Sequence, residues 1–189
     1  MRELVLMVHV SLDGFVAGSK GELDGFPGGQ ENLAFVTRIC KKGNTILFGR
    51  TTYELLNDYW TGARDKPGAT PEEVAYSRWY IKAGKIVVSS ATKTKDPNTI
   101  VWRENLIDRV KAMKQETGKA IIIFGSPSVS LQLMRENLID TYWIFINPVL
   151  FGSGIPLFLN DTLKTTFRRG QVKKFANGEV AIEYNKIKG

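Results

Sequence analysis

The sequence is poor in the residues from which metal sites and disulfide frameworks are built. Its 189 residues include one cysteine, Cys40, and one histidine, His9. A single cysteine excludes an intrachain disulfide framework and a zinc site built on cysteines. A single histidine excludes a histidine-rich metal site, and any histidine-centred triad would have to use His9. We therefore expect no metal cofactor.

Long apolar runs are also absent. A membrane-spanning helix needs about 20 apolar residues, whereas the run near the N-terminus covers only Leu4–Val10. That run leads into Ser11-Leu12-Asp13-Gly14 and not into a small-residue cleavage site, so it is unlike a signal peptide. Together with the single cysteine, these absences predict a soluble protein of the reducing cytoplasm without a membrane partner.

The charge balance is basic, but long runs of one sign are missing. Lys and Arg number 26 against 19 Asp and Glu, which gives a net charge of +7. Such a surplus is compatible with a polyanion such as nucleic acid or with an anionic small ligand. The basic residues are interspersed with acidic and apolar ones, and no predicted helix carries a basic stripe. We therefore expect a mostly solvated basic surface, a small-molecule ligand and no nucleic-acid partner.

Apolar periodicity predicts alternating strands and helices along a single domain, residues 1–189. The expected strands are 4–10, 45–48, 85–88, 99–102, 120–124 and 142–146, and the expected helices are 31–42, 52–60, 72–82, 104–116 and 127–137. After residue 148 the chain is β-rich, and Val180–Tyr184 alternates as a hairpin strand behind the turn Ala176-Asn177-Gly178. This order predicts an α/β fold with a mainly parallel sheet, helices on both faces and an antiparallel C-terminal edge.

Three loops that follow predicted strands are rich in glycine, hydroxyl groups or arginine. They are Gly49-Arg50-Thr51-Thr52, Ser89-Ser90 and Gly125-Ser126-Pro127-Ser128. Ligands of such sheets bind beyond the carboxyl ends of the strands, and helix N-termini present unpaired N–H donors to anions. Each loop alone is also compatible with a polar turn or a capped helix, and neither a GxGxxG motif nor a P-loop motif occurs. Together the loops indicate one extended phosphorylated ligand, such as a dinucleotide.

Other residues admit a structural or a functional interpretation. Asp13 follows the first strand, where Asp-Gly is usually a turn, although a carboxylate there can bind a substrate amine or relay a proton. His9 within an apolar strand is more typical of a core residue than of a site residue. In the helix 52–60, we expect Leu55, Leu56 and Tyr59 to face the core.

Five segments occur in an order that resembles a known superfamily. They are SLDGFVAG at 11–18, ILFGRTTYE at 46–54, KIVVSSAT at 85–92, IIIFGSPSVSLQLM at 121–134 and INPVLFGSGIPLF at 146–158. The chain resembles the dihydrofolate reductase-like superfamily. Within it, the chain is similar to the RibD C-terminal type reductase domain of riboflavin biosynthesis and its small stand-alone bacterial relatives. The resemblance implies a three-layer α/β/α fold and NADPH as cofactor.

The resemblance also implies a role for each residue on the cofactor side. Contacts to the nicotinamide carboxamide would come from the backbones of Val16 and Ala17. Phosphates would be held by Gly49, Arg50, Thr51 and Thr52, and the pyrophosphate by Gly125, Ser126, Pro127 and Ser128. The adenine ribose and its 2′-phosphate would lie by Ser89 and Ser90. Typical relatives carry Gly-Gly where this chain has Gly125-Ser126, which leaves open whether that peptide bond is cis.

On the substrate side, the resemblance places the nicotinamide near His9 and Asp13, and Asp13 is the catalytic candidate for substrate binding or proton relay. Folate reductases carry a pterin-binding carboxylate on the first helix. Ungapped alignment places Leu33 at that position, and Glu31 and Asn32 reach it only with a gap. His9, Asp13, Glu31 and Asn32 are therefore the candidate substrate-binding residues.

We expect an NADPH-dependent reductase that transfers a hydride to a pterin-like heterocycle or a ribosylaminopyrimidine, as a 5-amino-6-(5-phosphoribosylamino)uracil reductase does. The glycine-rich loop 19–30 would act as a lid. The missing helix carboxylate motivates an alternative, a non-catalytic NADPH-binding protein of the same fold. The resemblance also implies a homodimer, and Tyr142–Ile146 is a candidate apolar edge strand for pairing with the second subunit.

Overall fold

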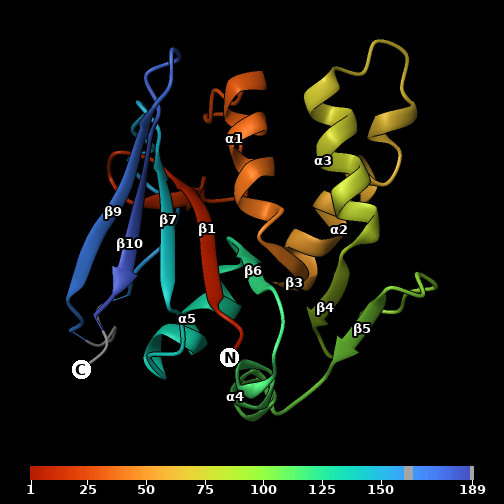
Figure 1. Ribbon diagram of the computed structural model, residues 1–189. Helices are drawn as coiled ribbons and strands as arrows, with labels where there is room; N and C mark the ends of the chain where they lie inside the picture. Colours follow the sequence, from red (N-terminus) through yellow and green to blue (C-terminus); the bar gives the residue numbers. More distant parts are fainter. Residues whose placement is uncertain (160–163, 188–189) are drawn as a thin grey trace.

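The computed structural model describes residues 1–159 and 164–187, and its centre is an eight-stranded sheet (Figure 1). The strands run in the order β5-β4-β3-β6-β1-β7-β10-β9. Their bounds are β1 Leu4–Val10, β3 Gly43–Gly49, β4 Gly84–Val88, β5 Thr99–Trp102, β6 Ala120–Phe124, β7 Thr141–Ile146, β9 Phe167–Lys174 and β10 Val180–Lys186. The pairs from β5 to β7 are parallel, while β10 runs antiparallel to both β7 and β9. The predicted parallel sheet with an antiparallel C-terminal edge is confirmed.

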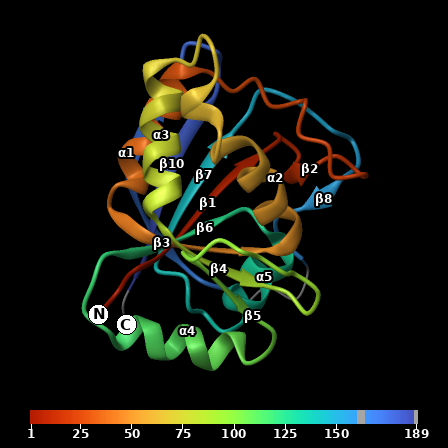
Figure 2. The same ribbon diagram turned by 90° about the vertical axis from the view of Figure 1, so that its right-hand side faces the viewer.

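Helices cover both faces of this sheet (Figures 1 and 2). One face carries α1 Gln30–Cys40, α2 Arg50–Trp60 and α3 Pro71–Lys82, and the other carries α4 Leu106–Gln115 and α5 Pro127–Arg135. A short 3-10 helix, Ala63–Asp65, connects α2 to α3, and a separate antiparallel ribbon joins β2 Phe15–Ala17 to β8 Ile155–Pro156. The described chain therefore has the predicted three layers.

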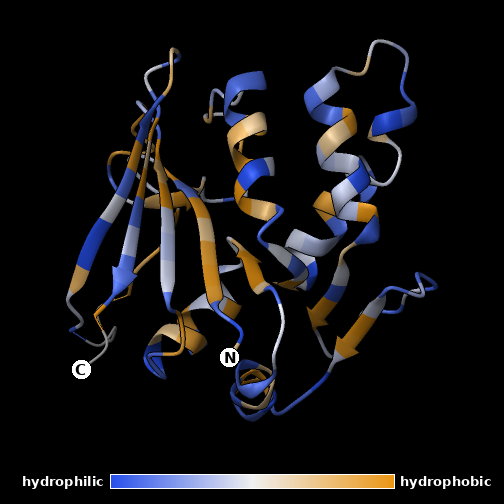
Figure 3. Ribbon diagram, viewed as in Figure 1, coloured by the Kyte–Doolittle hydropathy of each residue, from blue (hydrophilic) through white to orange (hydrophobic). Residues whose placement is uncertain are grey.

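The central strand β1 shows why the sequence gives a doubly covered sheet. Its side chains alternate between the faces, so that Val5 and Met7 pack with the core around α1 and α3. Leu4, Leu6 and Val8 pack with the core around α4 and α5. Because both faces are buried, the strand is apolar throughout, and β1 and β6 are coloured as hydrophobic in Figure 3.

The start of α3 confirms the helix that was predicted from Pro71. Thr70 caps the helix by accepting a hydrogen bond from the Glu73 backbone N–H at 3.2 Å, and the Glu73 side chain accepts one from the Thr70 N–H at 2.9 Å. Pro71 occupies the first turn, where its missing N–H costs no hydrogen bond. Local sequence therefore determines where this helix begins.

Two predictions about packing are wrong. Tyr142–Ile146 is not an edge strand, because β7 lies between β1 and β10 and is hydrogen-bonded to both; the edges of the sheet are β5 and β9. In α2, Leu55 and Tyr59 are 53% and 40% exposed. Leu56 faces the core as predicted, and the other inward positions are Tyr53 and Trp60, which recur with it at helical spacing.

Candidate active site

A cavity of about 620 Å³ lies where β1, β3 and β6 end. It is lined by Met7, Val8, His9, Val16, Ala17, Gly21, Leu23, Phe26, Gly28, Asn32, Gly49, Arg50, Thr51, Thr52, Leu55, Leu56, Phe124, Gly125, Ser126, Pro127, Ser128 and Ile155. These include every site residue expected from the sequence except Asp13, Glu31, Ser89 and Ser90. The volume is in the usual range for small-molecule sites.

Two helix N-termini meet at one side of the cavity. Helix α2 begins directly after β3, and α5 begins at Pro127 shortly after β6; β3 and β6 are neighbouring parallel strands, so both helices start at the same edge of the sheet. In neither helix does an N-cap side chain accept a hydrogen bond from the N–H groups of the first turn. Uncapped N–H groups and the positive ends of two helix dipoles make this side of the cavity suited to phosphate groups.

Ser126 ties the two helix starts together. Its hydroxyl accepts a hydrogen bond from the Gly49 N–H at 3.0 Å and donates one to Thr52 Oγ1 at 2.9 Å. Gly125 and Ser126 both have left-handed backbone conformations, with φ of 47° and 45°, and no peptide bond among the described residues is cis. For serine this conformation costs about 1–2 kcal/mol. Strained residues of this kind cluster at ligand sites, because the surrounding contacts hold them in place.

Arg50 places a positive charge at the same side. Its guanidinium is 55% exposed and lies 3.7 Å from the Glu54 carboxylate, one helical turn further on. An exposed pair of this kind contributes little to stability. Arg50 is therefore available to a phosphate without loss of an important internal contact.

His9 forms part of the opposite side of the cavity. Its ring stacks on Phe145, with the centroids 4.7 Å apart, and about a third of the side chain (33%) is exposed. Nδ1 points inward and lies 3.5 Å from Asn147 Nδ2 and 3.6 Å from Glu179 Oε1. Burial lowers the pKa of His9 to about 4, against the raising effect of the hydrogen bond with Asn147. The ring is therefore neutral at physiological pH.

Glu179 is a residue of this region that the sequence analysis missed. It is fully buried just before β10, and its Oε1 accepts a hydrogen bond from Asn32 Nδ2 at 2.6 Å. Burial raises the pKa of Glu179 to about 7, although hydrogen bonds with Asn177 and Asn32 act in the opposite direction. The available signal was an acidic residue between an Asn-Gly turn and an apolar strand, which we interpreted only as part of a hairpin.

Asp13 does not line the cavity. Its carboxylate accepts hydrogen bonds from Ser11 Oγ at 2.5 Å and from the N–H groups of Phe151 at 3.2 Å and Gly152 at 2.7 Å. These bonds, the one from Ser11 most of all, lower the pKa of Asp13. The carboxylate therefore joins the loop after β1 to the loop after β7, which differs from the predicted contact with substrate.

Glu31 also points away from the cavity. Its carboxylate accepts hydrogen bonds from Lys173 Nζ at 2.5 Å and from the Ala176 N–H at 3.3 Å, both in the β9–β10 hairpin. These partners lower the pKa of Glu31, the hydrogen bond with Lys173 having the largest effect. Asn32, the next residue on α1, is the one that faces the cavity. The two predicted α1 residues thus have different surroundings.

Ser89 and Ser90 lie outside the cavity lining as well. Ser89 Oγ accepts hydrogen bonds from the N–H groups of Ala91 at 3.1 Å and Thr92 at 3.0 Å, so it closes the turn after β4. A second hollow of about 700 Å³ lies next to this turn, between α2 and residues 93–96, and shares Leu55 with the cavity. Its charged side chains are the basic Lys93 and Lys95 and the acidic Glu54, Asp58 and Asp96.

The glycine-rich loop 19–30 supplies one wall of the cavity. Phe26 packs against Phe151 with the ring centroids 5.2 Å apart and lies 6.0 Å from the His9 ring. Asn177 Nδ2 donates to the Gly28 carbonyl at 2.7 Å, which ties the end of the loop to the β9–β10 hairpin. Movement of this loop as a lid stays a prediction.

Two further findings concern the described residues as a whole. None of their helices combines the length and the apolar character that a membrane crossing requires. They also contain no group of three or more His, Cys, Asp or Glu side chains placed to hold a metal ion.

Comparison with known proteins identifies the family and the fold. The family described as RibD C-terminal domain matches residues 2–181. The uncharacterized protein YyaP of Bacillus subtilis (strain 168) is 28% identical over 186 residues, which is 97% of this chain and 95% of YyaP. A putative riboflavin biosynthesis protein from Shewanella sp. PV-4 has a similar structure, with a TM-score of 0.73, 18% identity, and coverage of 98% of this chain and 99% of that one.

A larger protein shares the fold over part of its length. It is the diaminohydroxyphosphoribosylaminopyrimidine deaminase/5-amino-6-(5-phosphoribosylamino)uracil reductase of Thermotoga maritima. The TM-score is 0.70 at 15% identity, and the alignment covers 98% of this chain and 57% of that one. The match over residues 2–181 and the three-layer architecture show that this chain belongs to the RibD C-terminal domain family, whose fold is dihydrofolate reductase-like.

Proposed function

We propose that this protein is an NADPH-dependent reductase of a small nitrogen heterocycle, in the class of ribosylaminopyrimidines or pterins. The observation that carries the proposal is one cavity with two different ends. The cofactor end consists of the helix starts Gly49–Thr52 and Gly125–Ser128, and the substrate end contains His9 and Asn32. An anionic cofactor and a polar planar substrate therefore have separate places within reach of each other.

The residues of the cofactor end fit a dinucleotide. The uncapped starts of α2 and α5 and the Arg50 guanidinium are suited to the pyrophosphate. Val16 and Ala17 lie on the β2–β8 ribbon at the cavity wall, where their backbone groups would hold the carboxamide. For the 2′-phosphate we favour Lys93 and Lys95 over Ser89 and Ser90, because the lysines line the adjoining hollow and the Ser89 hydroxyl is already engaged. NADPH, when bound, supplies a hydride.

The substrate end fits a flat heterocycle with N–H groups. Phe26, Leu23 and Ile155 provide apolar walls, which suit the faces of a ring. Asn32 donates its amide N–H to Glu179, and within the described chain its Oδ1 has no partner. That oxygen is therefore available to accept a hydrogen bond from a substrate N–H. The similarity to the Thermotoga maritima protein, which is a 5-amino-6-(5-phosphoribosylamino)uracil reductase in one of its two activities, supports the same substrate class.

Binding is tested by titrating the protein with NADPH and with NADH, followed by fluorescence or calorimetry. We expect saturable binding with a preference for NADPH, and absence of NADPH binding at millimolar concentration would refute the proposal. Turnover is tested with 5-amino-6-(5-phosphoribosylamino)uracil and 7,8-dihydropterin as probes, by following the oxidation of NADPH. Binding of NADPH without oxidation in the presence of either probe would favour the alternative of a non-catalytic NADPH-binding protein.

A further inference from the structure

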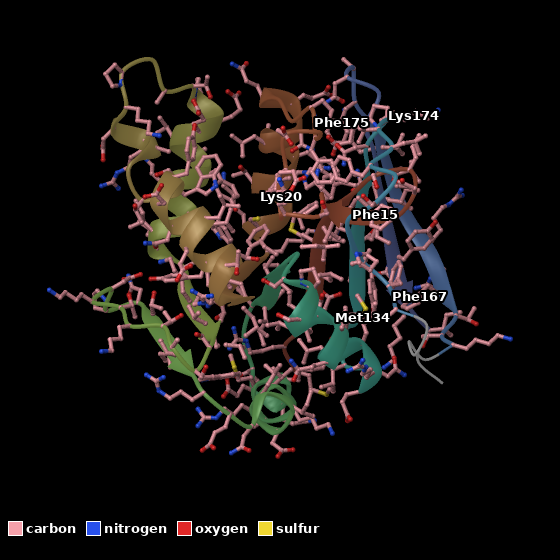
Figure 4. All side chains as sticks on the ribbon, turned by 180° about the vertical axis from the view of Figure 1, so that it is seen from behind. Phe15, Lys20, Met134, Phe167, Lys174 and Phe175 are labelled. Carbon is pink, nitrogen blue, oxygen red and sulfur yellow. The ribbon has the colours of Figure 1, made fainter. Side chains whose placement is uncertain are left out.

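A buried polar cluster lies beneath the substrate end of the cavity. Four segments contribute to it: His9 from β1, Asn32 from α1, Asn147 after β7 and Glu179 before β10. Asn147 and Glu179 are fully buried, and Asn32 is 7% exposed. Aromatic rings surround the cluster. Phe145 stacks on the His9 ring, and Phe175 of the hairpin (labelled in Figure 4) packs edge-on against Phe35 of α1, with the ring centroids 5.6 Å apart. An ionisable pair is thus held in apolar surroundings.

The surroundings of Glu179 favour the protonated, neutral form of its carboxyl group. Its Oε1 accepts the hydrogen bond from Asn32, while its buried Oε2 has no hydrogen-bond partner among the described residues. A carboxylate oxygen that is buried without a donor is strongly disfavoured, whereas a neutral carboxyl group is tolerated. The raised pKa of Glu179, about 7, agrees with this geometry.

Asn147 places an amide donor beside the His9 ring. Asn147 Nδ2 donates to the backbone carbonyls of Val10 at 3.2 Å and Phe145 at 3.0 Å, which fixes the orientation of the amide. The same Nδ2 lies 3.5 Å from His9 Nδ1, and a donor group opposite Nδ1 favours the tautomer with the ring proton on Nε2. Because Nδ1 points inward, Nε2–H belongs to the edge of the ring that faces the cavity.

Resting on the proposed function, we propose that His9 and Glu179 form a proton-donating pair for the reduction of a carbon–nitrogen double bond. His9 contacts the substrate, and Glu179, whose Oε1 lies 3.6 Å from His9 Nδ1, acts through His9. This pair takes the role that the sequence analysis gave to Asp13. The carboxyl group of the pair comes from the C-terminal hairpin, whereas the carboxylate on α1, Glu31, points away from the cavity.

The step balances without a further reactant. The substrate carbon receives the hydride of NADPH with its electron pair, and the carbon–nitrogen π bond opens toward nitrogen. That nitrogen takes the Nε2 proton of His9, while Nδ1 takes the proton of Glu179. The imidazole is neutral before and after the step, which suits a ring whose pKa is lowered. Solvent then delivers one proton to Nε2 at the cavity, and Nδ1 returns its proton to the buried Glu179, which restores the resting state of both groups.

Two other charged groups belong to the elements around the pair, Glu31 of α1 and Lys173 of β9, and they form an ion pair with each other. The groups that face His9 and Glu179 from α1, β7 and the hairpin are Asn32, Asn147, Phe145 and Asn177, none of which titrates. Phe26 faces the ring from the loop 19–30. A titration shared by His9 and Glu179 would therefore report on these two groups.

The single histidine makes the pair observable without substrate. We expect ¹⁵N NMR of His9 to show the Nε2–H tautomer at neutral pH. The Glu179 carboxyl carbon should titrate with a midpoint near pH 7, and the imidazole nitrogens should shift with the same midpoint while the ring stays uncharged; the ring itself should take up a proton only near pH 4. In Glu179→Gln the imidazole should lose this midpoint, and in the matched control Glu31→Gln it should keep it. Imidazole shifts without a midpoint near pH 7 in the wild type, or a midpoint near pH 7 that Glu179→Gln leaves unchanged, would overturn the pair, whatever substrate the protein takes.

Turnover gives the second test, with 5-amino-6-(5-phosphoribosylamino)uracil as the probe. Loss of a general acid typically lowers the rate by about 100-fold or more, so we expect a drop of that size in kcat for Glu179→Gln with unchanged NADPH affinity. The kcat of Glu179→Gln should also lose its dependence on pH near neutrality, and Glu179→Asp should recover part of the rate. Wild-type kcat in Glu179→Gln would overturn the proposal while leaving NADPH binding, and with it the proposed function, intact.

Discussion

The two ends of the cavity differ in how the chain builds them. The cofactor end uses two contiguous segments, Gly49–Thr52 and Gly125–Ser128, each at the start of a helix. The substrate end is assembled from distant residues; Asn32 and Glu179, which share a hydrogen bond, are 147 residues apart. Turn chemistry determines the first end locally, whereas the second depends on how the sheet brings β1, β7 and β10 together. Changes at the two ends should therefore have different consequences.

The largest effect is expected at the substrate end, in the pH dependence of stability. Glu179 has a folded pKa of about 7, above its ordinary value of 4.5, so the unfolded chain loses this proton first and stability falls as pH rises between those values. His9 has a folded pKa of about 4, below its ordinary 6.5, so its contribution makes stability rise over that window. In the wild type the two contributions oppose each other, and the profile should be nearly flat.

Removing one of the two side chains should make the pH dependence contributed by the other visible. In Glu179→Gln only His9 contributes, so the free energy of unfolding should increase as the pH rises from about 4 to 6.5. In His9→Gln only Glu179 contributes, so it should decrease as the pH rises from about 4.5 to 7. Each change should reach about 3 kcal/mol at most, at 1.4 kcal/mol per pKa unit. Urea unfolding at a series of pH values measures this, and flat profiles in both variants would contradict the account of the cluster.

The next effect is expected at the wall of the cofactor end. A Cβ at Gly154 would lie 2.3 Å from the Ala17 carbonyl oxygen, so Gly154→Ala must push the β2–β8 ribbon apart. We expect a loss of about 1–3 kcal/mol of unfolding free energy, typical of overpacking, and weaker NADPH binding. Gly62→Ala is the matched control, because a Cβ there has no neighbour within 4 Å. Equal stability of the two variants would show that the ribbon is not constrained as described.

A smaller effect is expected where Ser126 links the two helix starts. Ser126→Ala leaves the buried Gly49 N–H without its acceptor, which should cost about 1–3 kcal/mol. Ser126→Gly loses the same acceptor but relieves the left-handed conformation of a serine, which offsets about 1–2 kcal/mol. Ser126→Gly should therefore unfold at a higher urea concentration than Ser126→Ala. The reverse order would indicate that the backbone at position 126 is not strained.

The smallest effect is expected at the exposed Arg50. Because its guanidinium is half exposed and lies at the cavity, Arg50→Ala should weaken NADPH binding severalfold with little change in stability. Arg168→Ala, an exposed position on β9, serves as the control. Equal losses for NADPH and NADH would assign Arg50 to the pyrophosphate, and a larger loss for NADPH would assign it to the 2′-phosphate. Unchanged binding of both would exclude Arg50 from the cofactor end.

The same contrast explains how much the sequence could predict. The strands, the helix starts at Pro71 and Pro127 and the two glycine-containing junctions follow from local patterns, and the structure has them where they were expected. The order of strands at the C-terminal edge does not follow from such patterns, so β7 was taken for an edge strand. Asp13 and Glu31 were chosen by their position in the sequence, but hydrogen bonds with residues 138 and 142 positions away direct their carboxylates elsewhere.

Glu179 shows the limit most clearly. Nothing near it in the sequence distinguishes a buried carboxyl group from an exposed one at a hairpin turn. Its surroundings arise only when the hairpin packs against α1, through Phe175 on Phe35, and against the loop before α1, through Asn177 on Gly28. Residues whose role depends on packing between distant segments require the structure.

The central claim is that one cavity holds an NADPH cofactor at the helix starts and a substrate over His9. A crystal structure of the protein with NADPH tests it most directly. We predict the pyrophosphate at the first turns of α2 and α5, with the nicotinamide ring between Ala17 and His9. A pyrophosphate bound away from both helix starts, or a cavity without NADPH in crystals grown at millimolar cofactor, would contradict the claim.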